Sequence, residues 1–402
     1  MKRPKRAVKR QARKKMPQVA VLLETSHGIS RMELRGILKY VRVYGPWSIH
    51  NNVGGTSDLK MPDKLHWRGN GIIGRVPNDK VARQIADARL PTVLFNPGDK
   101  YLSAVHPLSN CCRTESDSAA IGRLAAQLYL AKPFPHFAFV GEATGINWSV
   151  RRQNAFAVKL AETGKTCHQY PMPPRSACGW DTERPLLCRW LKRLPKPVSI
   201  FAANDYRARQ VLDACLVTNI SVPYEAAVLG VNNDELICET SIPQLSSIAL
   251  DAEKAGYEAA RMLDALMQRQ IKEPQVISYG PSGVIARAST DALHVKDRLV
   301  VRALEFIRIN NGLTIRVSDV AQHLGVSSRW LEMRFSQTIG RAVNEEIRNA
   351  RMATVCAMLK ETDLPLSAIS KRCGFAHPNH LCTLFKSEHG MTMGDYRRQT
   401  SN

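Results

Sequence analysis

Short apolar runs rich in β-branched residues alternate with longer helical stretches from Gln18 to about Ala288. Polar or turn-forming residues bound each run, and this rhythm is typical of parallel strands joined by crossover helices. Strands are predicted at residues 19–23, 71–74, 92–95, 137–140, 199–203, 227–231 and 275–279, and helices at 31–43, 117–130, 152–162, 206–218 and 252–270.

Two proline-rich interruptions, at residues 171–174 and 195–197, divide this region. Seven strands over about 270 residues suit two doubly wound, parallel-sheet subdomains. We therefore expect residues 18–290 to form an α/β bilobed ligand-sensing domain. A cleft between two such subdomains is the expected ligand site.

After Ser289 the pattern changes to short amphipathic helices, which places a domain boundary near residues 288–298. A helix-turn-helix unit is predicted at residues 314–336. Ser318 is expected to cap its first helix and Gly325 to form the left-handed turn. Ser327 or Ser328 is expected to cap the second helix. The predicted buried positions are Val320, Ala321, Leu324, Leu331 and Phe335.

The same pattern recurs at residues 364–387, so we expect an all-α domain with two helix-turn-helix units. A connecting helix at about residues 345–360 would hold the units apart, so that their recognition helices enter successive major-groove segments. Ser367, Ile369, Ser370 and Gly374 each stand 49 residues after Ser318, Val320, Ala321 and Gly325, and Leu381 and Phe385 stand 50 residues after Leu331 and Phe335.

The recognition-helix positions outside the buried stripe are the candidate DNA-binding residues. They are Ser328, Arg329, Glu332 and Met333 on the first helix, and His377, Asn379, His380 and Thr383 on the second. Arg329 suits guanine and Asn379 suits adenine, whereas Glu332 suits cytosine and Met333 a thymine methyl group. Arg341, Arg348 and Lys386 are either phosphate contacts or solvated surface residues.

The net charge of +22 favours a polyanionic partner, either nucleic acid or an acidic membrane surface. Nine basic residues fall within the first fifteen, so residues 1–17 are expected to form a basic disordered arm. Such an arm adds sequence-independent attraction to phosphate. The part from Val295 onward carries +6 and the stretch between carries +7, so every region is basic.

The C-terminal region contains Arg351 and Leu359 in the connecting helix, followed by Ile369, Cys373, Gly374, Phe375, Phe385, Lys386, Gly390, Thr392, Tyr396 and Arg397. With these residues, it resembles the AraC/XylS-type transcription regulators over residues 297–399. The resemblance implies a sequence-specific DNA-binding domain, and activation is the usual outcome in that family.

Five segments of the N-terminal region carry a second resemblance, at residues 137–141, 151–156, 201–215, 222–236 and 245–263. With them, the region resembles the periplasmic-binding-protein-type sugar sensor of LacI-family repressors. Placed before an AraC-type domain, it is similar to the xylose operon regulators. The order implies a homodimer that binds operator DNA, responds to D-xylose or a similar pentose, and contacts RNA polymerase if it is an activator.

The sensor resemblance implies that Arg152, Asn204, Asp205 and Asn232 bind sugar hydroxyls. Charged and amide groups at strand ends can each engage two vicinal hydroxyls, so the assignment is chemically sound. Trp148 either stacks on a sugar face or is a packed aromatic residue. The family more often has Asp at the position of Asn232, which leaves the identity of the sugar open.

Several other motifs point away from rival functions. The string from Gly69 to Gly74 fits G-x-G-x-x-G, but its isoleucines form a predicted strand and no helix follows, so no nucleotide cofactor is expected. His377 and His380 lie near Cys373 and Cys382, but a zinc site there would disrupt the recognition helix, so no metal is expected.

No serine elbow, cysteine–histidine motif or carboxylate pair indicates an enzyme. The remaining alternatives are a ligand-independent architectural DNA-binding protein and, less favoured, a sugar-processing enzyme. The ten cysteines, among them Cys188, Cys215, Cys356 and Cys373, form no C-x-x-C pair and are expected to be reduced core residues of a cytoplasmic protein. No signal peptide or membrane span is expected.

Overall fold

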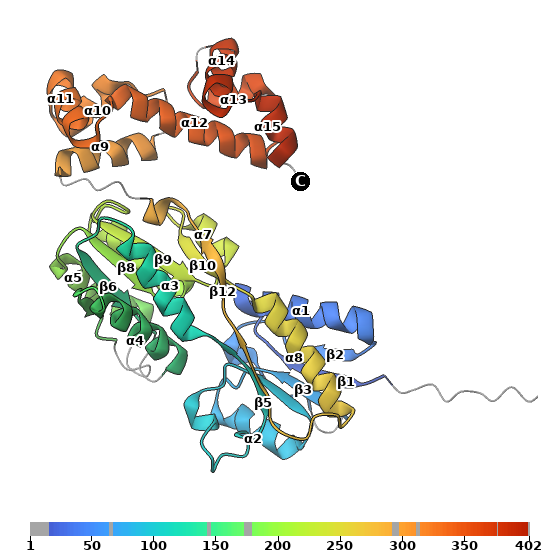
Figure 1. Ribbon diagram of the computed structural model, residues 1–402. Helices are drawn as coiled ribbons and strands as arrows, with labels where there is room; N and C mark the ends of the chain where they lie inside the picture. The colour runs from blue at the N-terminus through green and yellow to red at the C-terminus, as the bar shows by residue number, and fades with distance from the viewer. Residues whose placement is uncertain are drawn as a thin grey trace, which may run out of the picture. The chain divides into compact units, whose positions relative to one another are not determined.

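The computed structural model describes residues 16–63, 67–142, 146–172, 179–291, 297–310, 314–375 and 377–400. Most of the basic arm expected at residues 1–17 lies outside this part of the chain. The chain divides into two compact units, residues 1–291 and residues 292–402 (Figure 1). Within the described residues, no helix is both long and apolar enough to cross a membrane.

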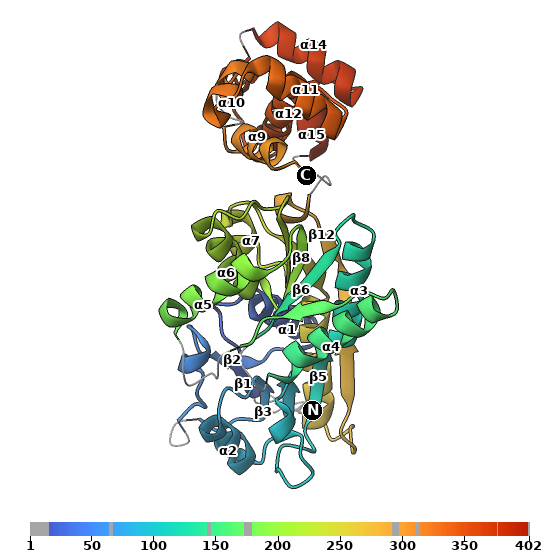
Figure 2. The same cartoon turned by 90° about the vertical axis from the view of Figure 1, so that its left-hand side faces the viewer.

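The first unit contains two six-stranded sheets in its described part, one in each of two lobes (Figure 2). The sheet of lobe 1 comprises β1 (Gln18–Leu22), β2 (Ser48–Asn51), β3 (Gly71–Gly74), β4 (Thr92–Phe95), β5 (Cys112–Ser116) and β11 (Val276–Tyr279). The sheet of lobe 2 comprises β6 (His136–Val140), β7 (Cys167–Gln169), β8 (Val198–Ala202), β9 (Ala226–Val231), β10 (Ser246–Leu250) and β12 (Pro281–Ile285).

The strand orders are β11-β5-β4-β3-β1-β2 in lobe 1 and β12-β10-β9-β8-β6-β7 in lobe 2. All described pairings are parallel except that of β12 with β10. The chain passes between the lobes after β5, after β10 and after β11. Lobe 1 carries helices α1 (Gly28–Tyr44), α2 (Asp79–Ala88) and α8 (Ala252–Met267), and lobe 2 carries α3 (Ser118–Leu130), α4 (Asn147–Ala161), α5 (Trp180–Arg193), α6 (Asp205–Val217) and α7 (Glu235–Thr240).

Helices α1 and α8 pack closely against each other on lobe 1, and two glycines permit this approach. A Cβ atom on Gly36 would lie 1.9 Å from the carbonyl oxygen of Glu253, and one on Gly256 would lie 1.9 Å from that of Glu33. Either contact is far inside van der Waals distance, so a larger residue at either position would force the helices apart.

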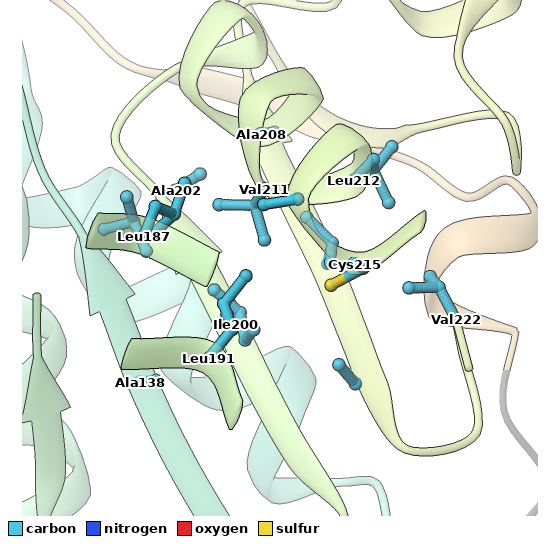
Figure 3. Packing of buried hydrophobic residues seen from close by; sticks show 14 of the residues in the cluster. Ala138, Leu187, Leu191, Ile200, Ala202, Ala208, Val211, Leu212, Cys215 and Val222 are labelled. Atoms are coloured by element: carbon cyan, nitrogen blue, oxygen red, sulfur yellow. The ribbon is translucent and has the colours of Figure 1, made fainter. Parts of the chain in front are cut away.

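One core cluster of lobe 2 lies between its sheet and the helices α5 and α6. Leu187 and Leu191 of α5 meet Ile200 of β8 and Val211 of α6, and all four are fully buried (Figure 3). Burial of each such side chain contributes about 1.5–3 kcal/mol. This packing fixes the ends of the strands from which the cleft residues project.

The second unit is all helical in its described part, and its longest helix, α12, connects two pairs of shorter ones (Figure 1). Val343, Ile347, Val355 and Leu359 of α12 are buried against these pairs. Its helices are α9 (Arg298–Ile309), α10 (Val317–Leu324), α11 (Ser328–Ile339), α12 (Val343–Glu361), α13 (Leu366–Arg372), α14 (Pro378–His389) and α15 (Met393–Thr400).

All seven predicted strands are present, but β2, β5, β7, β10 and β12 were not predicted. The strands β2, β7 and β12 lie at sheet edges, where solvent permits polar side chains that weaken the apolar pattern. The interior strand β10 contains Ser246 and Ser247, which are buried but hydrogen-bonded to Arg287 and Asp205. A local sequence pattern cannot predict that buried serines are hydrogen-bonded to residues that are distant in the sequence.

Two local predictions were wrong. Ser318 does not cap α10, because the helix begins at Val317 and the carboxylate of Asp319 accepts a hydrogen bond from the backbone N–H of Arg316 instead. Not all cysteines are core residues either: Cys382 is exposed, and Cys188 and Cys356 are half-buried. The nine described cysteines are free thiols.

Candidate functional site

A cavity of about 640 Å³ in the first unit is lined by residues of both lobes. Many of its polar residues follow directly or closely after parallel strands, where the carboxyl ends of the strands converge. Lobe 1 supplies Glu24, Arg75 and Asn96 after β1, β3 and β4, and lobe 2 supplies Glu142, Asn204 and Asn232 after β6, β8 and β9.

The five residues predicted to bind a ligand all line this cavity. They come from three separate segments of lobe 2 and are Trp148, Arg152, Asn204, Asp205 and Asn232. The structure therefore brings the predicted set together, although their side chains differ in what else they contact.

Arg152 is buried on α4 and is held in place from two sides. Its Nη1 donates a hydrogen bond to the carbonyl oxygen of Ala203 at 2.5 Å, and its guanidinium carbon lies 4.7 Å from the centroid of the Trp148 ring. Burial lowers the pKa of Arg152 to about 10, so the group remains charged near neutral pH. Its buried Nε has no hydrogen-bond partner within the described chain, which leaves a donor available for a polar ligand.

Asn204 is both a helix cap and a cleft residue. Its Oδ1 accepts from the backbone N–H of Arg207 at 2.8 Å, which caps α6, and its Nδ2 donates to Oε1 of Glu142 at 2.8 Å. Glu142 therefore belongs to the candidate site, although it was not predicted. Asn232 has a positive φ of 106°, in a region that asparagine adopts more readily than most residues.

Asp205 makes different contacts from the other four residues. Its Oδ1 accepts from the hydroxyl of Ser247 at 2.5 Å and its Oδ2 accepts from the backbone N–H of Asp234 at 2.7 Å. Burial raises the pKa of Asp205 to about 7, because the charged form loses its hydration. The side chain thus positions the loop after β9, and both of its oxygens are already engaged.

Lobe 1 contributes a charged network that the sequence analysis did not identify. Nη2 of Arg75 donates to both carboxylate oxygens of Glu33, at 2.9 and 2.8 Å, and Nε of Arg75 lies 3.5 Å from Oε1 of Glu24. Burial raises the pKa of Glu33 to about 7 against the attraction of Arg75. Burial also raises the pKa of Glu24. The positive charge of Arg75 and a hydrogen bond to His27 outweigh this effect and lower the pKa of Glu24 to about 2.

The cleft residues of lobe 1 were not predicted, although their positions in the sequence resemble those of the predicted residues in lobe 2. Glu24, Arg75 and Asn96 each follow a strand that was predicted, as Asn204 and Asn232 do in lobe 2. Because the carboxyl ends of parallel strands meet at one edge, polar residues at these positions are candidates in both lobes.

The second unit contains both helix-turn-helix pairs, α10 with α11 and α13 with α14. The matched glycines Gly325 and Gly374 have φ values of 71° and 73°, so each forms the left-handed turn. Ser327 caps α11 by accepting from the backbone N–H of Trp330 at 3.3 Å. The matched apolar pairs are buried alike: Val320 and Ile369, Leu331 and Leu381, and Phe335 and Phe385.

Seven of the eight candidate DNA-binding residues are exposed, and Glu332 is half-buried. The exposed residues are Ser328, Arg329 and Met333 on α11, and His377, Asn379, His380 and Thr383 on or next to α14. Oε2 of Glu332 accepts from the backbone N–H of Val343 at 3.2 Å, so this carboxylate caps α12. A hydrogen bond from Glu332 to a base would therefore compete with this contact to α12.

Arg351 connects α12 to both helix-turn-helix units. Its Nη2 donates to the carbonyl oxygen of Ile315, before α10, at 2.7 Å, and its Nη1 donates to that of Gly374, after α13, at 3.5 Å. Of the other basic residues, Arg341 pairs with Glu346 at 2.5 Å and Arg348 with Glu388 at 3.5 Å, whereas Lys386 is exposed.

Comparison with known proteins assigns both units. A model of the periplasmic binding protein-like domain matches residues 116–290, and a model of the helix-turn-helix domain matches residues 320–399. The xylose operon regulatory protein of Haemophilus influenzae is 30% identical over 331 residues, which cover 82% of this chain and 84% of that protein. This chain belongs to the family of the xylose operon regulatory proteins.

Two further relatives extend the similarity over nearly the whole length of the chain. The xylose operon regulatory protein of Escherichia coli strain K12 is 28% identical over 387 residues, covering 95% of this chain and 97% of that protein. The solved structure of the xylose-binding transcription activator xylR is 27% identical, with a TM-score of 0.83, and covers 96% of this chain and 98% of that chain.

Family membership confirms the predicted combination of a LacI-like sensor with an AraC-type DNA-binding domain. It also confirms that the protein is a DNA-binding transcription regulator, since its relatives are regulators rather than enzymes.

Proposed function

We propose that this protein is a cytoplasmic regulator that binds D-xylose, or a similar pentose, and activates genes of xylose utilisation. The observation that carries the proposal is the cleft itself. Residues selected from the sequence for sugar binding line one cavity, in a chain whose family is named for the xylose operon. A pentose presents several adjacent hydroxyls, which suit convergent amide, carboxylate and guanidinium groups.

In the cleft, Arg152 supplies hydrogen-bond donors, while the Asn204 and Asn232 amides supply both donors and acceptors. Glu142 and Glu24 add acceptor oxygens, one from each lobe. Asp205 acts by positioning the loop after β9. One face of the Trp148 indole is taken by Arg152, so a sugar would contact its other face or its edge.

A ligand that touches both lobes favours their closed arrangement. Such a ligand changes DNA affinity only by as much as its own affinities for the active and inactive forms differ. In this proposal the closed sensor repositions the DNA-binding units of a homodimer along neighbouring half-sites. Activation would then require a contact with RNA polymerase.

On DNA, the two recognition helices of one chain would enter successive major-groove segments on the same face. Arg329, Met333, Asn379 and His380, which are exposed on these helices, are proposed to contact base edges. Sedimentation of the protein with and without operator DNA tests the dimer, and a monomer in both conditions would contradict it.

Thermal unfolding with a panel of pentoses, hexoses and sugar acids tests the effector. A true effector at about a hundred times its dissociation constant should stabilise the sensor by roughly 2.7 kcal/mol. D-Xylose is expected to give the largest shift. A shift with other ligand classes but none with D-xylose would overturn the assignment.

A further inference from the structure

An aspartate of lobe 2 caps a helix of lobe 1. Asp234 follows β9, and its Oδ2 accepts from the backbone N–H of Gly28, the first residue of α1, at 2.7 Å. Its Oδ1 accepts from Nη2 of Arg31, one turn further along α1, at 3.2 Å. Asp234 is only 7% exposed, so this contact between the lobes is shielded from solvent.

Helix α1 lacks a cap of its own, which explains why the contact is favourable. His27 at the N-cap position makes no side-chain capping hydrogen bond, and the first turn contains no acidic residue. A carboxylate from the other lobe therefore accepts a hydrogen bond from the free N–H group of Gly28 and interacts favourably with the positive end of the helix dipole.

The glycine at position 28 makes room for this carboxylate. A Cβ atom at Gly28 would lie 2.6 Å from Cγ and 2.7 Å from Oδ2 of Asp234. Both contacts are too short for unbonded atoms, so any larger residue would displace the carboxylate.

Asp234 is also fixed on its own side of the cleft. Its backbone N–H donates to Oδ2 of Asp205 at 2.7 Å, and Oδ1 of Asp205 accepts from the Ser247 hydroxyl at 2.5 Å. Asp205 is 1% exposed. The carboxylate that reaches lobe 1 is thus tied through its backbone to the start of α6, and through Asp205 to β10.

A second contact between the lobes provides a natural comparison. Asp99 of lobe 1 accepts from Nη2 of Arg151 at 3.0 Å and from Nδ2 of Asn147 at 2.7 Å, both on α4. The side chains of Arg151 and Asp99 are 49% and 63% exposed, so water and salt screen this pair. Of the two carboxylates, Asp234 is the one placed to stabilise closure.

We propose that Asp234 is an interlobe latch, which closes the lobes on each other before an effector binds and thereby sets the sensitivity of the sensor. Its effect on effector affinity rests on the proposed function, whereas its effect on the free protein does not. Loss of the latch lowers the closed fraction, and the apparent dissociation constant rises in inverse proportion to that fraction.

Two substitutions on opposite lobes break the latch independently. Asp234→Asn removes the charge that Arg31 and the helix dipole attract, while Gly28→Ala displaces the carboxylate without altering it. Alanine favours helix more than glycine does, so a loss of closure in Gly28→Ala cannot come from a weaker α1. Asp99→Asn is the matched control at the exposed contact.

Hydrogen exchange of the full-length, effector-free protein tests the latch directly. In the wild type the amide of residue 28 should be protected, and in Asp234→Asn the segment around it should exchange at least roughly tenfold faster. Gly28→Ala should show the same acceleration, and Asp99→Asn should match the wild type. Equal exchange in all four proteins, or equal acceleration in Asp99→Asn, would overturn the proposal. A folded state is verified by an unchanged exchange pattern in the β8 and β9 core.

Calorimetric titration with D-xylose then tests the effect on sensitivity. Both latch variants should bind roughly tenfold or more weakly than the wild type and than Arg151→Gln, which removes the exposed contact at a residue outside the cavity lining. Unchanged affinity in variants that exchange faster would overturn the role in sensitivity. If the wild type does not bind D-xylose, the proposed effector is wrong, but the exchange experiment on the free protein still decides whether the latch exists.

Discussion

The guanidinium of Arg152 lies 4.7 Å from the centre of the Trp148 indole ring, one helical turn earlier on α4. This contact and the hydrogen bond to Ala203 hold a buried positive charge at the wall of the cleft. A charge held in this way needs no reorganisation to donate to a hydroxyl, which is the property of a preformed binding site.

Replacing Arg152 with Gln is expected to weaken D-xylose binding by about 1.5–3 kcal/mol, the range for a hydrogen bond to a charged group. Arg151→Gln is the matched control, because Arg151 is the neighbouring arginine but is half exposed and contacts Asp99. Calorimetry of both variants measures the difference. Equal affinities for the two variants would show that Arg152 does not contact the sugar.

Arg329 on α11 is expected to read a base. Arg329→Ala should cost roughly 1–3 kcal/mol in operator affinity and relax the preference at one base position. Arg334→Ala on the same helix is the control, since Arg334 pairs with Asp297 at 2.6 Å and lies 5.5 Å from the Trp330 ring. Binding to a library of single-base operator variants distinguishes them; uniform weakening in Arg329→Ala would identify a phosphate contact.

Glu332 is expected to act as the cap of α12 more than as a base reader. Glu332→Ala should lower the free energy of unfolding of the DNA-binding unit by about 1 kcal/mol, the usual cost of losing a cap. Its base preference should stay unchanged. Chemical denaturation and the operator library measure the two effects. Unchanged stability together with an altered base preference would show that Glu332 reads a base.

The buried carboxyl of Glu33 should make the sensor less stable as the pH rises. Its pKa is about 7 when folded and 4.5 ordinarily, so between these values the folded state holds a proton that the unfolded state has lost. The free energy of unfolding therefore falls from pH 4.5 to 7, and Asp205 contributes in the same direction.

Glu33→Gln should consequently flatten, but not abolish, this decline. Glu253→Gln is the control, because Glu253 lies on the facing helix α8 with a side chain that is 49% exposed. Denaturant unfolding at several pH values between 5 and 7 gives the slopes. A Glu33→Gln slope as steep as that of the control would mean that Glu33 is ionised throughout this range.

The sequence predicted the architecture well because apolar periodicity is a local property. The recurrence of Gly325 as Gly374 and of Phe335 as Phe385 identified both helix-turn-helix units, and the structure gives each pair the same turn or burial. Likewise, the polar residues after predicted strands include much of the cleft.

What the sequence did not reveal depends on contacts between distant residues. Asp205 was expected to bind sugar, and the sequence did not reveal that Ser247, 42 positions away, and the backbone of Asp234 donate hydrogen bonds to its oxygens. Glu332 was expected to contact DNA, and the sequence did not reveal that its carboxylate also caps a helix that begins 11 positions later. No local pattern carries such information, because these partners meet only after the chain has folded.

The most direct test of the account is the affinity of the full-length protein for its operator, with and without sugar. The operator is selected from a random DNA library in the presence of D-xylose, and fluorescence anisotropy then gives the dissociation constant at fixed salt. We predict that D-xylose strengthens binding at least about fivefold, that D-glucose does not, and that Arg152→Gln removes the effect. An operator affinity that is the same with and without saturating D-xylose would contradict a sugar-responsive regulator.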